Sequence, residues 1–171
     1  MTEMGVTSLK GNLTNPQRTF LWDVIIPEPI GGGDTETLML RCTSTNIPGE
    51  AVGQIAIPYK QTAGVVIPGK RTLSHTWQCV FLEGEDEKSI DSLRPWLMAS
   101  VDNDGKSLGD DAIKRDVYLQ LVSTKGENTR KIKLVGAYVQ DIAEVPLSYD
   151  AEDVVRYTIT FAYDDVEGST T

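Results

Sequence analysis

Near its carboxyl end the chain reads Val155-Arg156-Tyr157-Thr158-Ile159-Thr160-Phe161-Ala162-Tyr163. Large apolar residues alternate here with small or polar ones. This two-residue period is typical of a β-strand that turns one face to a core and the other to its surroundings. The same alternation recurs in several earlier segments, so the sequence predicts a mainly β protein built from antiparallel strands.

Six segments share this pattern. The predicted strands are Phe20–Ile26, Leu38–Ser44, Arg71–Leu82, Ile113–Val122, Lys131–Ile142 and Val154–Tyr163. After the third strand, acidic residues precede apolar ones at helical spacing (Ile90, Leu93, Leu97), which predicts a helix that Pro95 should kink or split. We therefore expect a small antiparallel β-barrel or sandwich of about six strands, with one flanking α-helix and a long protruding loop.

The length of 171 residues fits one domain. Residues 1–19 are predicted to form an N-terminal arm, 20–165 the β-barrel domain, and 166–171 a flexible, polar C-terminal tail. Lys and Arg number 16 and Asp and Glu 25, so the net charge is 16 − 25 = −9. This balance argues against tight binding of nucleic acid, because such affinity comes from cationic side chains on phosphates.

Residues 45–70 are interrupted by prolines and glycines, yet they are apolar. We interpret them as a long protruding loop or hairpin, which in a compact domain is usually functional. Two interpretations stay open: the segment packs on its own barrel, or it packs on a neighbouring subunit. For the second, the expected inter-subunit contact residues are Ile57, Tyr59, Val65, Val66 and Ile67.

Two motifs imitate ligand sites without the context that those sites need. Gly64–Lys70 matches the start of a phosphate-binding loop, but Arg71 replaces the Ser or Thr that holds magnesium, and a strand is predicted where a helix should begin. Asp102–Gly105 resembles the start of a calcium loop, but its glycine comes two places early, so a turn is the better interpretation.

The sequence offers no convincing catalytic group. His75 and Cys79 would share one strand face, but their Cα atoms would be ~13 Å apart, too far for direct activation. We expect no catalytic residues, no metal site and no cofactor, and therefore no enzyme. Without an export signal or a bilayer-length apolar run, Cys42 and Cys79 are expected to be free thiols and no membrane insertion is expected.

The order of several short segments resembles the tail tube protein of contractile-tailed phages of the T-even type. The segments are Asn15-Pro16, Phe20–Val24, Asn46–Gly49, Ile57-Pro58-Tyr59, Pro68–Thr72, a Trp-bearing strand and a Trp-bearing helix, Val145–Asp150, and Tyr157–Phe161. The resemblance covers roughly residues 15–165, and it lies in order and spacing rather than in one motif. Residues 28–37 form a longer turn than the pattern needs, so we expect the surface to differ there.

The resemblance implies a structural subunit of the inner tail tube. Six copies would form a ring, and stacked rings would enclose a channel for DNA, which the tube does not bind tightly. The other implied partners are the tail sheath, baseplate, tail terminator and tape measure proteins. The subunit would be made in the bacterial host cytoplasm and end in the virion.

A net charge of −9 suits a channel wall that repels DNA, and the polar faces of residues 71–78 and 114–122 are candidates for that wall. One alternative function is the tube of a related contractile injection or type VI-like secretion system. An alternative of another class is a monomeric β-sandwich that binds a ligand. That module would need exposed aromatic side chains, whereas the tryptophans lie on apolar strand and helix faces.

Overall fold

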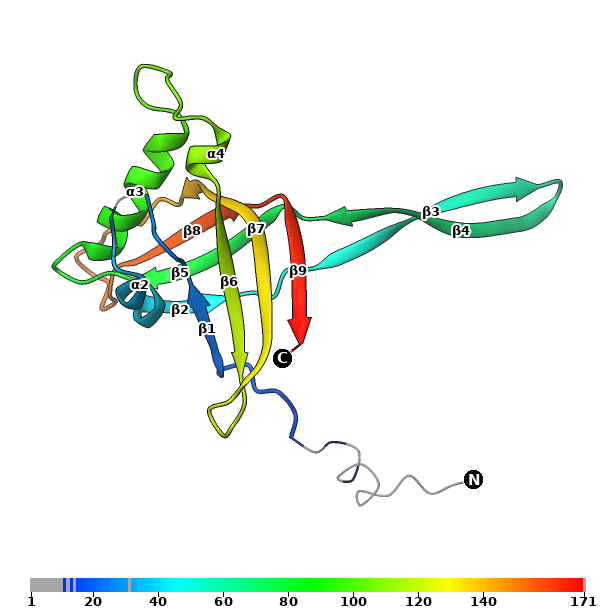
Figure 1. Cartoon of the computed structure of the whole chain (residues 1–171), viewed down its shortest axis with the longest axis horizontal. Helices are drawn as coiled ribbons and strands as arrows, with labels where there is room; N and C mark the ends of the chain where they lie inside the picture. Colours follow the sequence, from blue (N-terminus) through cyan, green and yellow to red (C-terminus); the bar gives the residue numbers. More distant parts are fainter. Residues whose placement is uncertain (1–10, 12, 14, 31, 171) are drawn as a thin grey trace.

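The computed structural model describes residues 11, 13, 15–30 and 32–170, so residues 1–10, 12 and 14 of the predicted arm lie outside it. The elements are β1 (Trp22–Ile25), α2 (Thr35–Arg41), β2 (Cys42–Thr45), β3 (Glu50–Tyr59), β4 (Thr62–Leu73), β5 (Thr76–Leu82), α3 (Lys88–Ser100), α4 (Asp110–Ile113), β6 (Arg115–Val122), β7 (Asn128–Ile142), β8 (Arg156–Ala162) and β9 (Asp165–Thr170). The predicted mainly β, antiparallel fold is confirmed, with more short elements than expected (Figure 1).

Seven strands form one folded sheet in the order β1-β6-β7-β8-β5-β2, with β9 also paired to β7. The first part of β7 pairs with β6 and β9, and its last part pairs with β8, so this strand belongs to two layers. At the change of layer, Gly136 has a φ of 64° and donates its N–H to Asp116 Oδ1 at 3.2 Å. A Cβ atom here would collide with the Asp164 carboxylate, so this bend requires glycine.

The core lies between the two layers and is closed by α3. Phe161 of β8 lies between two tryptophans, with ring centroids 5.7 Å from Trp77 and 5.9 Å from Trp96. Both indole N–H groups donate to backbone oxygens, that of Trp77 to Asn46 and that of Trp96 to Ile113. The predicted core positions of Trp77 and Trp96 are confirmed, and both are fully buried.

The helix predicted after the third strand is present as α3. The expected split at Pro95 is wrong, because α3 runs from Lys88 to Ser100 as one element. Proline removes one backbone hydrogen bond from a helix, but Leu93 and Trp96 beside it are buried in the core. Their packing holds the helix together through this position.

The strand predicted over Leu38–Ser44 is wrong in its first half, where α2 lies. Asp34 caps α2 by accepting the N–H groups of Glu36 and Thr37 at 3.2 and 3.3 Å. Only Leu38 of the alternating apolar residues is buried, while Leu40 is exposed. The local capping signal therefore overrides the short alternation that suggested a strand.

The long strand predicted over Arg71–Leu82 is two strands. β4 ends at Leu73 and β5 begins at Thr76. Between them His75 has a φ of 55°, which interrupts the extended backbone, and its Nδ1 lies 3.0 Å from the carbonyl oxygen of Tyr163. The ribbon of β3 and β4 leaves the body of the protein at this break.

The flexible tail predicted over 166–171 needs correction, because residues 165–170 form β9. Its ladder with β7 runs from the Val135–Asp165 pair to the Arg130–Thr170 pair. Val166 is buried in the core. Backbone pairing to β7 orders this segment although it has only one large apolar side chain.

The two cysteines are free thiols, as expected. Cys79 is buried on β5 and Cys42 is half-buried on the adjacent β2. Burial raises the pKa of the Cys79 thiol well above its ordinary value, which keeps it protonated and unreactive.

Candidate assembly surface

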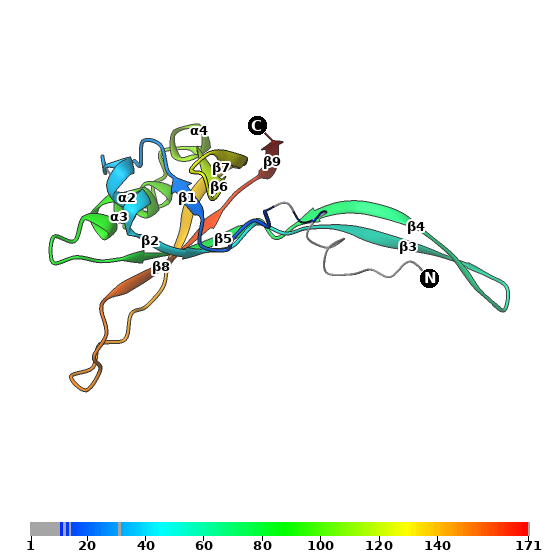
Figure 2. The same ribbon diagram turned by 90° about the horizontal axis from the view of Figure 1, so that it is seen from below.

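The β3–β4 hairpin projects far beyond the two-layered body (Figures 1 and 2). Among the described residues its two strands, which cover residues 50–59 and 62–73, pair only with each other. The expectation of a long protruding hairpin in residues 45–70 is therefore confirmed. Of the two interpretations of its packing, burial on its own barrel is wrong, because nearly all of the hairpin is exposed.

The exposed apolar residues of the hairpin form facing pairs. Ile55 lies opposite Ile67, and Ile57 lies opposite Val65. Residues directly opposite in an antiparallel pair share a face, and alternation along β3 places Tyr59 on that same face. The structure thus brings four of the five predicted contact residues onto one face of the hairpin.

Val66, the fifth predicted contact residue, lies opposite Ala56 on the other face. Of the five, Tyr59 and Val65 are the most exposed, each at 61%. Contiguous exposed apolar surface of this kind is rare on monomeric proteins and usually marks a site of association. Whether these five residues contact another subunit stays a prediction.

A salt-bridge cluster fixes the base of the hairpin. Arg71 of β4 lies 2.9 Å from the Glu50 carboxylate of β3 and 3.2 Å from the Asp165 carboxylate of β9. The hydrogen bond to Glu50 and the nearby charges raise the pKa of Arg71 above its ordinary value. Arg71 therefore links the base of the hairpin to β9 of the body.

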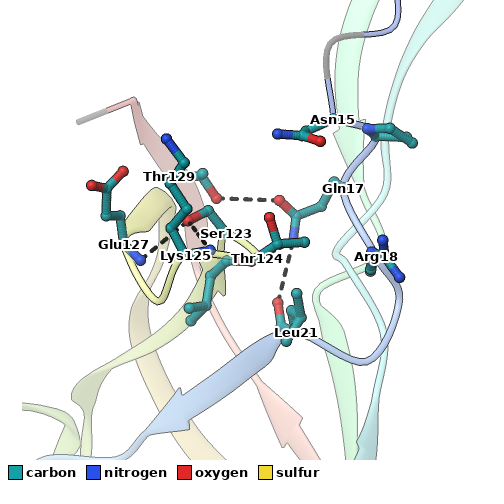
Figure 3. Close-up of a pocket in the computed structure, with 11 residues that line it drawn as sticks. Asn15, Gln17, Arg18, Leu21, Ser123, Thr124, Lys125, Glu127 and Thr129 are labelled. Carbon is teal, nitrogen blue, oxygen red and sulfur yellow. Dashed lines mark hydrogen bonds between the residues drawn. The ribbon is translucent and has the colours of Figure 1, made fainter. Parts of the chain in front are cut away.

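The last described residues of the arm lie in a small cavity of about 220 Å³ beside the β6–β7 turn (Figure 3). The side-chain amide of Gln17 donates to the carbonyl oxygens of Leu21 and Val122 at 3.2 and 2.9 Å. Thr129 donates in turn to Gln17 Oε1. These polar contacts hold the arm where it meets the sheet, and they leave no room for a sizeable ligand.

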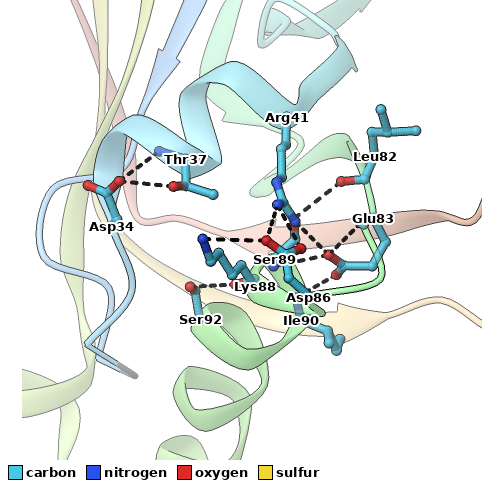
Figure 4. Close-up of polar contacts among 11 residues, drawn as sticks. Asp34, Thr37, Arg41, Leu82, Glu83, Asp86, Lys88, Ser89, Ile90 and Ser92 are labelled. Atoms are coloured by element: carbon cyan, nitrogen blue, oxygen red, sulfur yellow. Dashed lines mark hydrogen bonds and ion pairs between the residues drawn. The ribbon is translucent and has the colours of Figure 1, made fainter.

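A second polar cluster holds the start of α3 (Figure 4). Glu83 is almost fully buried, and its carboxylate accepts the backbone N–H groups of Ser89 and Ile90 at 3.2 and 2.9 Å. Arg41 of α2 donates to Glu83 at 2.9 Å and to Asp86 at 2.7 Å, and that bond lowers the pKa of Asp86. Glu83 therefore caps α3 although it lies in the loop before the helix begins.

The motifs that imitate ligand sites have structural roles. Residues 64–70 lie within strand β4 of the hairpin and do not lead into a helix. Asp102 Oδ1 accepts the N–H groups of Asp104 and Lys106, which closes a turn. Within the described ranges no group of three metal-ligating side chains gathers, and no helix there is long and apolar enough to cross a membrane.

Sequence reasoning missed Arg71 and Glu83 as positioning residues. Glu83 is one of the acidic residues that precede the predicted helix, but its side chain differs from those of its acidic neighbours in being buried. Its place six and seven residues before the N–H groups that it accepts follows no local capping pattern, so only the folded chain reveals it.

Comparison with protein families gives a match to the phage tail tube protein family over residues 25–167. A search among curated proteins returned no match.

Several solved structures have the same fold. A chain of the anti-feeding prophage tube-terminating cap is 16% identical, with a TM-score of 0.65 over 92% of this chain and 93% of that one. A chain of the sheath/tube terminator of the PVC extracellular contractile injection system is 15% identical, with a TM-score of 0.66 over 91% and 98%. A chain of the PVC sheath-tube complex is 15% identical, with a TM-score of 0.60 over 98% and 99%.

Proposed function

Because this chain belongs to the phage tail tube protein family, a structural and non-enzymatic family, we propose that it builds the inner tube of a contractile phage tail. Six copies form a closed ring, and the rings stack into a hollow tube through which DNA leaves the virion. The observation that carries this proposal is the exposed apolar hairpin, which a solitary molecule leaves in water.

The hairpin supplies energy for assembly. Fully burying one Val or Ile side chain is worth ~1.5–3 kcal/mol, so covering a half-exposed one yields about 1 kcal/mol. Five such residues are the proposed contacts with sister copies: Ile57, Tyr59, Val65, Val66 and Ile67. Together they give enough free energy to hold neighbouring subunits when each copy is linked to several others.

The proposed channel wall is the outward face of β5 and β8. On that face Gln78 lies opposite Thr160, Thr76 lies opposite Ala162 and Thr158 lies opposite Val80, and these side chains are uncharged. The other candidate, the outward face of β6 and β7, carries Lys131 and Lys133. Arg156 stands on the same face at the start of β8, where its guanidinium is paired with the Asp153 carboxylate at 2.8 Å. The face therefore offers no unpaired cation to phosphates, and a DNA duplex slides along it without being held.

The proposed partners are the sheath outside the tube, the tape measure protein inside it, and the baseplate and terminator proteins at its ends. This proposal is supported by the similar solved structures, which come from a tube-terminating cap, a sheath-tube complex and a baseplate.

The second candidate function is the tube of an extracellular injection system, which those same structures favour because they come from such machines. Electron microscopy of particles from the producing bacterium separates the two. Tubes attached to DNA-filled capsids support the phage tail, and tubes without capsids support the injection system.

The assembly proposal is tested with a pair of facing substitutions, Ile57→Asp with Val65→Asp. Negative-stain microscopy should show rings and tubes for the native protein and dispersed small particles for the variant, with unchanged circular dichroism. The matched control is Val101→Asp with Leu108→Asp, two equally exposed apolar residues between α3 and α4. If the hairpin variant forms tubes as the control does, the hairpin is not the assembly surface.

A further inference from the structure

A groove lies beside the loop that joins β7 to β8. Figure 2 shows this loop at the end of the body away from the hairpin. Its volume is about 640 Å³. One wall is the 83–87 loop before α3, and the other is the β7–β8 loop. The groove and the hairpin are thus at opposite ends of the molecule.

The apolar part of the groove is unusually exposed. Leu147 is 81% exposed and Val154 is 54% exposed, and both line the groove together with the half-buried Tyr157. The neighbouring Tyr149 is fully exposed. These side chains form the apolar floor of the groove, and exposed apolar surface of this kind usually marks a site of association.

The rim of the groove carries free negative charge. Glu85, Glu87 and Glu144 line it, are exposed, and form no ion pair with any of the described residues. By contrast, Glu83 and Asp86 both form ion pairs with Arg41 (Figure 4). The acids left over are therefore available to a cationic partner.

The hairpin has the complementary character. Between residues 51 and 70 its only charged side chains are Lys60 and Lys70, a net charge of +2 in a chain whose total is −9. Lys60 lies at the tip, with its ammonium group 5.4 Å from the ring centroid of Tyr59. Neither lysine forms an ion pair with the described residues.

We propose that the groove receives the β3–β4 hairpin of a second copy, with apolar hairpin residues on the Leu147 and Val154 floor and Lys60 against the acidic rim. This inference rests on the proposed function and names its docking site. Because the two surfaces differ and lie at opposite ends, the contact is head-to-tail, and an open series of copies keeps a free hairpin at one end and a free groove at the other. Such a contact propagates along a tube.

Disulfide trapping between two variants tests the contact. A Lys60→Cys chain mixed with a Glu144→Cys chain should form a mixed disulfide dimer on mild oxidation, and neither chain alone should do so to the same extent. The matched control replaces the second chain with Lys125→Cys, an exposed lysine on the β6–β7 turn. Equal trapping of both pairs, or none, would overturn the inference.

Charge reversal gives a second readout that does not need cysteines. Lys60→Glu and Glu144→Lys should each raise the lowest protein concentration that forms tubes about tenfold, while one chain with both changes recovers it, since each ~1.4 kcal/mol is a factor of ten. If the native protein forms tubes but the double variant does not recover the native concentration for tube formation, this docking site is wrong and the proposed tube function still stands. A native protein that never forms rings or tubes overturns both.

Discussion

Removing the Glu83 carboxylate should destabilise the fold strongly although the residue lies outside the apolar core. It accepts backbone N–H groups of the 83–90 segment and the Arg41 guanidinium, and it is only 5% exposed. Breaking a buried ion pair costs about 3–5 kcal/mol. Arg41 keeps Asp86 as a partner, so we expect about 3 kcal/mol for Glu83→Ala.

Urea unfolding of dilute, unassembled protein measures this loss. For a domain of this size, ~3 kcal/mol corresponds to a fall in Tm of about 6–12 °C. The matched control is Glu85→Ala, two residues away, exposed and unpaired, which should change stability by less than about 0.5 kcal/mol. Equal stability of the two variants would refute the view that Glu83 caps α3 and joins it to α2.

Three further predictions follow from single contacts. Arg71→Met should reduce tube formation severalfold but lower the Tm by less than about 4 °C, because exposed ion pairs are worth ~0.2–1 kcal/mol. The control is Arg71→Lys, which keeps the positive charge, and equal assembly of the two variants would contradict the prediction. Gly136→Ala should cost about 2 kcal/mol or more in urea unfolding, because its φ of 64° and the Asp164 carboxylate both oppose a side chain; unchanged stability would mean that the bend tolerates other residues. The hydrogen bond from Lys133 lowers the pKa of Asp116 below its ordinary 3.8. This pair therefore stabilises the fold above about pH 4, and the stabilisation is lost as the pH falls through the lower pKa of the folded state. The stability difference between the native protein and Asp116→Asn should shrink as the pH falls, and it would stay constant if the pair contributed nothing.

The alternating strands could be predicted from the sequence because burial on one face leaves a pattern in the chain itself. The β8 strand and the buried faces of β5, β6 and β7 follow that pattern. β9 could not be predicted, since it has one buried apolar residue, Val166, and depends on pairing with β7. α2 could have been found from Asp34 and the charges at its two ends, which suit a helix better than a strand.

The projecting hairpin could be predicted because prolines and glycines interrupt residues 45–70, while the residues between them are too apolar for an ordinary solvated loop. Its exposure on both faces was not, because a chain pattern does not say what lies above a strand. The same limit applies to the groove: Leu147, Val154 and Glu144 are distant from the acids at 85 and 87 in sequence, and the pairing of β5 with β8 brings them together.

The geometry of the hairpin makes it a lever. A ten-residue strand rises ~3.4 Å per residue, so the tip lies about 34 Å from the root. A rotation of ~5° at the His75 break or at the Arg71 cluster therefore moves the tip by about 3 Å, the scale on which side chains exchange neighbours. In the proposed tube, small substitutions at the root of the hairpin would therefore change the rise and twist between successive subunits without altering the contact residues themselves.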